Sequence, residues 1–228
     1  MKNDTLFGRQ MTPSRKWSLG LFFIALVVSG TLIAAPNYTG WQKGPWEKYD
    51  NDDGVTMYIN ESVPTGVDAV RVDTVLPYPA DQLFPIITDP ERAKSYSFIK
   101  EFRPIENHGT WGYLYQRVRA TGVDDRDFTV RLDLFQPDTP NGGPYGWRWI
   151  QANEHGPKET DAVRAKVAAG SYVLTPIANG TQTRVSYRIW FDPGTWVPDF
   201  LVNPAVRSSA KETVIRLRKD AKKKFAKK

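Results

Sequence analysis

Apolar and polar residues alternate along much of the chain between residues 55 and 191, with the period of two that half-buried strands show. Asn179-Gly180 separates two such stretches and is typical of a tight hairpin turn. Strands joined by short turns pair antiparallel, so the pattern predicts a curved antiparallel sheet. The predicted strands are 55–59, 70–76, 99–106, 111–120, 128–134, 147–152, 167–176 and 183–191.

A helical period replaces this alternation from Pro204 to Lys228. A proline suits the first turn of a helix, so we expect the helix to begin there. Its apolar stripe needs an apolar surface, which the sheet supplies. The stripe consists of Val206, Ala210, Val214, Leu217, Ala221 and Phe225. The other faces carry Arg207, Lys211, Arg216, Arg218, Lys219, Lys222, Lys223 and Lys224.

Two shorter helices are expected between the second and third strands. Residues 80–88 place Leu83, Ile86 and Ile87 on one face, and Asp89-Pro90 caps a second helix over residues 91–96. Strands, short helices, more strands and a terminal helix give an α+β fold.

The N-terminal end predicts export. Arg15-Lys16 precedes the apolar run 19–35, which reads as a signal peptide or a membrane anchor; either would take the rest of the chain out of the cytoplasm. We therefore expect the domain to be periplasmic or anchored to the membrane. The predicted divisions are a leader (1–35), a linker (36–45) and one domain (46–228).

Charge is unevenly distributed along the chain. Residues 207–228 hold ten Lys and Arg against two acidic residues, whereas residues 36–206 hold 17 basic and 22 acidic ones. A mildly acidic body with basic ends favours an anionic membrane surface as a partner and argues against nucleic acid. A solvated helix face with a frayed lysine tail explains the same charges equally well.

Candidate chemistry is sparse. The chain has no cysteine, which excludes disulfides and thiolate catalysis. The acidic run 50–53 lacks the glutamate that would close an EF-hand, and we expect neither a metal nor another cofactor. The two histidines, His108 and His155, stand beside glycines in turn-like stretches, and no nucleophile or phosphate-loop motif appears.

Four motifs in order resemble the START domain, the lipid-transfer module related to steroidogenic acute regulatory protein. They are Pro-x-x-x-Leu-Phe-x-x-Ile-x-Asp-Pro-Glu-Arg (79–92), Arg-Asp-Phe (126–128), Gly-Ser-Tyr-Val-Leu-Thr-Pro (170–176), and Asp-Pro-Gly (192–194) with Pro-Asp-Phe-Leu-Val-Asn (198–203). The resemblance covers roughly residues 46–222.

The resemblance implies a helix-grip fold, in which a curved sheet wraps the C-terminal helix around a hydrophobic tunnel for one lipid. It implies binding and carriage of a phospholipid, a sterol or another apolar molecule, with a cyclase or hydratase acting on such a ligand as the alternative. The candidate lipid-binding residues are Arg126, Phe128, Val130, Leu132, Tyr113, Trp147, Trp149, Val206, Ala210 and Val214. The loop 137–146 is the implied gate, with Pro137, Asn141, Gly142, Gly143 and Pro144 as its residues.

Each of these residues also has a structural interpretation. Arg126 either reaches a lipid polar group or forms an ion pair or turn contact at the start of its strand, and the aromatic residues either line the tunnel or fill the core. Sterol-binding members carry a second arginine six residues after the one in Arg-Asp-Phe. Here Arg131 comes one residue sooner, so alternation points it away from the face of Phe128 and Val130.

Overall fold

The computed structural model describes residues 40–119, 123–194 and 197–226 of the 228-residue chain. The expected leader or anchor, residues 1–35, lies outside this part. Within the described part, no helix combines the length and the apolar character that a membrane crossing requires.

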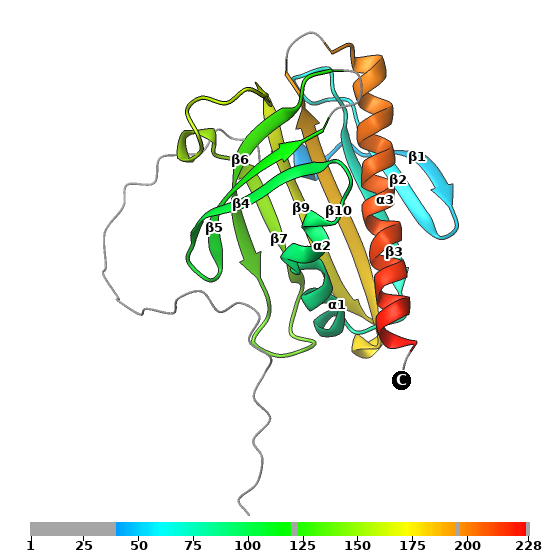
Figure 1. Cartoon of the computed structure of the whole chain (residues 1–228). Coiled ribbons are helices and arrows are strands. Elements are labelled where there is room, and N and C mark those ends of the chain that lie inside the picture. The colour runs from blue at the N-terminus through cyan, green and yellow to red at the C-terminus, as the bar shows by residue number, and fades with distance from the viewer. Residues whose placement is uncertain (1–39, 120–122, 195–196, 227–228) are drawn as a thin grey trace, which may run out of the picture. The chain divides into compact units, whose positions relative to one another are not determined.

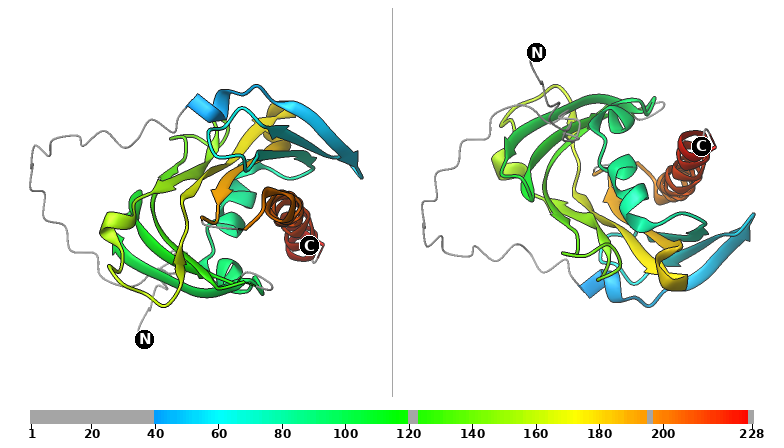
Figure 2. Two further views of the ribbon diagram at one scale, coloured as in Figure 1. Left: turned by 90° about the horizontal axis from the view of Figure 1, so that it is seen from above. Right: turned by 90° about the horizontal axis from the view of Figure 1, so that it is seen from below.

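The strands of the described residues form one ten-stranded sheet, ordered β1-β2-β3-β10-β9-β7-β6-β5-β4, with β8 paired to β6 off this path. Pairs along the path are antiparallel, as predicted. The sheet bends so that its two ends form the walls of a trough (Figure 2). The strands are β1 (Glu47–Asp52), β2 (Val55–Asn60), β3 (Ala69–Leu76), β4 (Ile99–Asn107), β5 (Trp111–Val118), β6 (Arg126–Phe135), β7 (Tyr145–Gln151), β8 (Val163–Arg164), β9 (Val167–Ile177) and β10 (Gln182–Asp192).

Three α-helices of the described residues lie on the concave side of this sheet (Figures 1 and 2). They are α1 (Ala80–Ile87), α2 (Pro90–Lys94) and α3 (Asp199–Phe225). The carboxylate of Asp89 caps α2 by accepting a hydrogen bond from the Glu91 backbone N–H at 3.0 Å, as predicted. Because the three helices lie on the concave side, they face the inner side chains of the strands.

The long helix starts earlier than predicted. It begins at Asp199, directly after Pro198, and Pro204 lies inside it. The prediction placed Pro204 in the first turn, but a carboxylate beside the free N–H groups and a preceding proline favour Asp199 as the start. Pro204 then removes only the hydrogen bond to the Phe200 carbonyl.

The apolar stripe of α3 is buried against the sheet. Val206, Ala210 and Val214 are 6%, 1% and 0% exposed, and they belong to one core cluster with inner residues of β2, β3, β9 and β10. Val202 extends the stripe by a further turn. This face of α3 is what fixes the helix in the trough.

Ion pairs hold one side of α3 to the acidic run near β1 and β2. Lys211 Nζ lies 2.9 Å from Asp50 Oδ2 and 3.2 Å from Asp52 Oδ2, and Arg218 pairs with Asp53 at 2.6 Å. The hydrogen bond from Lys211 lowers the pKa of Asp50. Arg207 pairs with Asp68 further along the helix. Arg216 donates to the Ser95 carbonyl, so four of the eight basic residues are engaged within the fold. Four exposed lysines remain at the end of the helix, Lys219, Lys222, Lys223 and Lys224.

The segment before β1 packs on the domain. Gly40–Lys43 forms a 3₁₀ turn, and Trp41 is 7% exposed with its ring centroid 6.0 Å from that of Trp190. Its backbone carbonyl accepts a hydrogen bond from Asn60 Nδ2 at 3.1 Å. Trp41, which lies within the predicted linker 36–45, is therefore packed against the strands.

Candidate functional site

The inner face of the sheet is only partly covered by helices. α3 packs mainly on β3 and β10, and there the inner side chains are buried: Val72, Leu76, Val185 and Tyr187 are 0–9% exposed. On β6 and β7, in contrast, several inner apolar side chains keep exposed surface although they face the concave side. These are Leu132, Leu134, Trp147 and Trp149.

Strand register places most of the predicted lining residues on this concave face. Leu132 lies opposite Trp149, and Phe128 and Val130 share its side of β6. Phe128 and Val130 are 6% and 2% exposed, so they belong to the packed floor of the trough. Trp147 and Trp149 lie with ring centroids 4.8 Å apart at the junction between this floor and the main core.

A glycine makes room for one of these indoles. Gly170 pairs with Trp149 across β7 and β9, and a Cβ on Gly170 would lie 2.0 Å from Cζ2 of Trp149. The Trp149 ring therefore lies directly against the backbone of β9 at Gly170, in space that any larger residue would occupy.

Tyr113 does not take the position that we predicted for it. It pairs with Arg131 across β5 and β6, whereas its neighbour Leu114 pairs with the inner residue Val130. The Tyr113 ring stacks on His155 with centroids 3.8 Å apart. Because side chains alternate along a strand, Tyr113 lies on the outer face and does not line the trough.

Arg131 points outward, as predicted. It shares the outer face with Asp133, whose Oδ1 lies 3.2 Å from Arg131 Nε, and its guanidinium lies 4.7 Å from the Trp111 ring centroid. The inner wall of β6 after Arg126 is therefore apolar.

Arg126 is held by backbone carbonyls. Its side chain is fully buried, its Nε donates to the Pro193 carbonyl at 3.1 Å, and its Nη1 donates to the Asp124 carbonyl. These contacts tie the start of β6 to the chain leaving β10. These contacts of Arg126 match the structural interpretation, in which it forms a turn contact at the start of its strand.

Asp127 anchors a separate network on the outer side. It accepts hydrogen bonds from Arg164 Nε at 2.8 Å, Thr160 Oγ1 at 2.7 Å and Tyr115 Oη at 3.1 Å. Burial, followed by the adjacent Asp127, raises the pKa of Tyr115 to about 12.

A polar cluster between the helices and the sheet was not among the predicted residues. Arg92 of α2 donates from Nε to Asp220 Oδ2 at 2.8 Å and from Nη2 to the Thr213 carbonyl at 3.2 Å, both on α3. Tyr96 follows α2, and Arg92 and Arg216 lie 5.6 and 4.3 Å from its ring centroid. On the sheet, Tyr172 and Tyr187 interact electrostatically with Arg92.

Two signals in the sequence pointed to this cluster. Arg92 closes the first motif of the START resemblance, and Tyr172 lies in the third, with the parity of the inner residue Leu174. Neither signal shows that α2 and β9 meet, because that contact depends on the bend of the sheet.

A search of solved structures finds the same architecture. The STAR-related lipid transfer protein fragment from Xanthomonas axonopodis matches with a TM-score of 0.65 and 21% identity, over 77% of this chain and 97% of that one. Human STARD10 matches with a TM-score of 0.65 and 18% identity, over 79% of this chain and 77% of that one. Human StAR-related lipid transfer protein 5 matches with a TM-score of 0.68 and 14% identity, over 80% of this chain and 90% of that one.

The chain has the START fold. The helix-grip architecture predicted from four motifs is therefore confirmed. No protein-family model matches the sequence, and no curated protein does so either. The START likeness establishes the fold, and the function has to be argued from the residues.

The loop expected to be the gate joins β6 to β7 and comprises residues 136–144. It begins one residue earlier than predicted, and it ends two residues earlier because Tyr145 and Gly146 belong to β7. Tyr145 Oη donates to the Pro140 carbonyl at 3.0 Å. The Asn141 side chain fills the space beside Gly180 in the β9–β10 turn, where a Cβ would lie 2.1 Å from Asn141 Oδ1. The loop is thus latched to its neighbours at two points.

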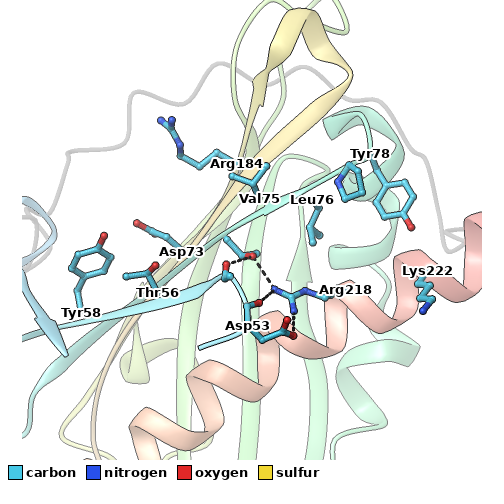
Figure 3. Close-up of a pocket in the computed structure, with 13 residues that line it drawn as sticks. Asp53, Thr56, Tyr58, Asp73, Val75, Leu76, Tyr78, Arg184, Arg218 and Lys222 are labelled. Carbon is cyan, nitrogen blue, oxygen red and sulfur yellow. Dashed lines mark hydrogen bonds and ion pairs between the residues drawn. The ribbon is translucent and has the colours of Figure 1, made fainter. Parts of the chain in front are cut away.

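A solvent-open pocket of about 680 Å³ lies outside the trough, where the β1–β2 turn meets β3 and α3 (Figure 3). Arg218 crosses it and reaches the Asp53 carboxylate and Thr74 Oγ1, at 2.6 and 3.2 Å. Arg184 and Lys222 also line it. The lining mixes apolar surface with the charged side chains of Asp53, Arg184 and Arg218, which a lipid tail would cut off from water.

The two histidines lie away from the concave face of the START fold. His155 stacks on the outward Tyr113, and His108 stacks on Trp111, the outward neighbour of Tyr113 in alternation, with ring centroids 4.0 Å apart. His108 Nε2 is 3.1 Å from Glu106 Oε2 at the surface. Neither imidazole is placed to act on a molecule inside the trough.

Proposed function

We propose that this protein binds one apolar lipid between the concave face of the sheet and α3, and that it carries or presents this lipid outside the cytoplasm. The main support is the incomplete burial of Leu132, Trp147 and Trp149 on the inner side of β6 and β7. Covering apolar surface is favourable, by about 0.8 kcal/mol for each CH₂ of a lipid tail. A sixteen-carbon chain would therefore contribute on the order of ten kcal/mol.

Export and membrane contact complete the proposal. The apolar run 19–35 after Arg15-Lys16 supports export. At the other end of the chain, α3 ends in the exposed basic residues Lys219, Lys222, Lys223 and Lys224. Lysines near an anionic bilayer surface contribute about 1 kcal/mol each, so this end of α3 is the part proposed to meet the membrane.

Lipid exchange requires an opening in the packed unit. We assign it to the loop 136–144, which is held by Tyr145 and by the Asn141 side chain against Gly180. Loops that open on microsecond to millisecond timescales commonly control the entry and release of ligands.

A transfer assay between two vesicle populations tests the proposal. Leu132→Trp fills the exposed inner face, and Ile150→Trp adds the same bulk on the outer face, where Ile150 pairs with Arg131. The purified full chain should move lipid from donor to acceptor vesicles, Leu132→Trp should lose most of this activity, and Ile150→Trp should keep it. Equal activity of both variants, or none in the wild type, would contradict the proposal.

The same assay separates carriage from catalysis. If the protein is a cyclase or a hydratase, the lipid recovered after incubation has a changed mass. Recovery of unchanged lipid is the expected result, since chemistry needs a positioned acid or base and both histidines lie on the outer side.

A further inference from the structure

Four polar side-chain atoms on the inner side of the sheet are buried without a hydrogen-bond partner among the described residues: Arg126 Nη2, Trp147 Nε1, Gln151 Oε1 and Tyr172 Oη. Two of them belong to neighbouring residues, the hydroxyl of Tyr172 and Nε1 of Trp147. Tyr172 is 1% exposed, and it pairs with Trp147 across β7 and β9 with ring centroids 6.3 Å apart. Buried polar groups normally have partners, so two neighbouring exceptions mark a place where a bound molecule can supply an acceptor.

The surroundings of Tyr172 are polar on the helix side as well. Tyr187 lies beside it on β10, with ring centroids 5.2 Å apart. Arg92 of α2 interacts electrostatically with both tyrosines, and Tyr96 interacts with Tyr172 in the same way. Polar groups from β7, β9, β10 and α2 therefore converge between the sheet and the helices, next to the apolar wall of β6.

The groups that face this place are hydrogen-bond donors. Burial raises the pKa of Tyr172 and of Tyr187 far above the usual value, so both hydroxyls keep their protons at any physiological pH. The indole N–H of Trp147 can only donate. A tyrosine hydroxyl can also accept, whereas the indole N–H needs an acceptor, so an acceptor is the ligand group that suits both Trp147 and Tyr172.

Charge balance decides which acceptor fits. Arg92 is the cation that interacts with Tyr172 and Tyr187, and Asp220 already neutralises it at 2.8 Å. Arg216, the other cation of the cluster, lies over the Tyr96 ring and donates to the Ser95 carbonyl. A carboxylate or phosphate placed beside Tyr172 would add an unbalanced negative charge in a poorly solvated place, which is costly. An uncharged oxygen avoids that cost and still accepts from Tyr172.

We infer that the interior selects an apolar lipid that carries an uncharged oxygen, a hydroxyl or a carbonyl, placed against Tyr172 and Trp147. This inference rests on the proposed lipid-binding function and specifies its ligand class. Arg92 and Asp220 act here as a neutral pair that keeps anionic groups out.

Three sixteen-carbon probes test the inference with the full chain: hexadecan-1-ol, hexadecane and palmitate. Tyr172→Phe should weaken the affinity for hexadecan-1-ol roughly fivefold to tenfold, the range expected for one lost hydrogen bond. The affinity for hexadecane should change by less than about twofold. Tyr58→Phe makes the same change on the outer face of β2, where the Tyr58 ring stacks on Arg71, and should alter neither affinity. Palmitate should bind more weakly than hexadecan-1-ol at pH 8.

The outcomes separate this inference from the proposed function. Binding of all three probes with no effect of Tyr172→Phe on hexadecan-1-ol would overturn the inference and leave lipid binding intact. Tighter binding of palmitate than of hexadecan-1-ol would also overturn it. If none of the probes binds and vesicle transfer also fails, the proposed function itself is wrong.

Discussion

At the scale of single residues, the pair of Arg92 and Asp220 sets the charge that the interior presents to a ligand. The Arg92 side chain is 10% exposed, whereas that of Asp220 is 35% exposed, so the cation lies deeper than its partner. Burial disfavours the charged form of Arg92, but its interactions with Tyr172, Tyr96 and Asp220 together outweigh burial and raise its pKa. The carboxylate on α3 therefore controls whether this cation is balanced.

Asp220→Asn should shift ligand preference toward anions. Removing the carboxylate leaves the charge of Arg92 unbalanced, so palmitate should gain about threefold to tenfold in affinity relative to hexadecan-1-ol. Asp53→Asn is the control, because it frees Arg218 outside the trough. Equilibrium binding of both probes measures the shift, and an unchanged ratio in Asp220→Asn would argue against the assigned role.

The raised pKa of Tyr115 predicts how the free energy of unfolding changes with pH in the alkaline range. Burial and Asp127 raise its pKa from 10.0 to about 12, so the folded state holds this proton more tightly than the unfolded chain does. The stabilisation of the folded state by protonated Tyr115 is complete below pH 10, and it is lost as the pH rises from 10 through 12. In urea unfolding, Tyr115→Phe should lose less stability over this window than the wild type, whereas Tyr58→Phe should follow the wild type.

A parallel loss in Tyr115→Phe and wild type would mean that Tyr115 ionises equally easily in both states. The same window also contains the buried Tyr172 and Tyr187, whose pKa values are raised, so the wild-type curve should decline steeply.

At the scale of elements, periodicity located the strands and α3 well and left their ends and partners uncertain. The start of α3 was missed because two prolines, Pro198 and Pro204, lie near it. The helical period of the apolar residues does not show which of the two prolines marks the start of the helix. β1 and β8 escaped prediction because β1 is mostly polar and β8 has only two residues. β1 is held by its pairing with β2 and by Lys211 rather than by an apolar face. Tyr113 was placed on the wrong face, since register with β6 is set by tertiary pairing.

The basic end of α3 predicts binding to anionic vesicles. Changing its four exposed lysines to glutamine should weaken this binding at least tenfold in low salt, because each contributes about 1 kcal/mol near an anionic surface. A sedimentation assay with phosphatidylglycerol vesicles measures the effect. The altered lysines are Lys219, Lys222, Lys223 and Lys224, and the control changes four exposed lysines elsewhere, Lys43, Lys48, Lys158 and Lys166.

Both variants lose the same net charge, so equal weakening would show that total charge, not α3, governs attraction to the membrane. In that case the solvated-face explanation of the lysines would stand.

The latch of the loop 136–144 predicts the rate of lipid release. Asn141→Ala combined with Tyr145→Phe removes the side chain that fills the space beside Gly180 and the hydrogen bond to the Pro140 carbonyl. Release of a fluorescent lipid into excess vesicles should become about threefold to tenfold faster, while the free energy of unfolding changes by only about 1 kcal/mol. Asn107→Ala at the end of β4, whose side chain accepts from the Gly109 backbone N–H, is the control outside this loop. An unaltered release rate in the double variant would exclude the loop 136–144 as the gate.

At the scale of the packed unit, the order of elements along the sequence predicts the fold. It does not predict which part of the sheet's inner face α3 leaves uncovered. Alternating strands, two short helices and a terminal amphipathic helix were sufficient to predict a curved sheet around α3. That α3 covers β3 and β10 while inner residues of β6 and β7 keep exposed surface depends on how far the sheet bends. The polar cluster of Arg92 and Tyr172 was missed for the same reason.

The central claim is that a lipid occupies the space beside β6 and β7, and mass spectrometry of the natively purified full chain tests it most directly. Lipid extracted from the protein should amount to about one molecule per chain, with a hydroxyl or carbonyl oxygen and no net charge at that group. The Leu132→Trp variant should yield far less. If the wild type yields no lipid, both as purified and after incubation with vesicles, the account of this protein as a lipid carrier is contradicted.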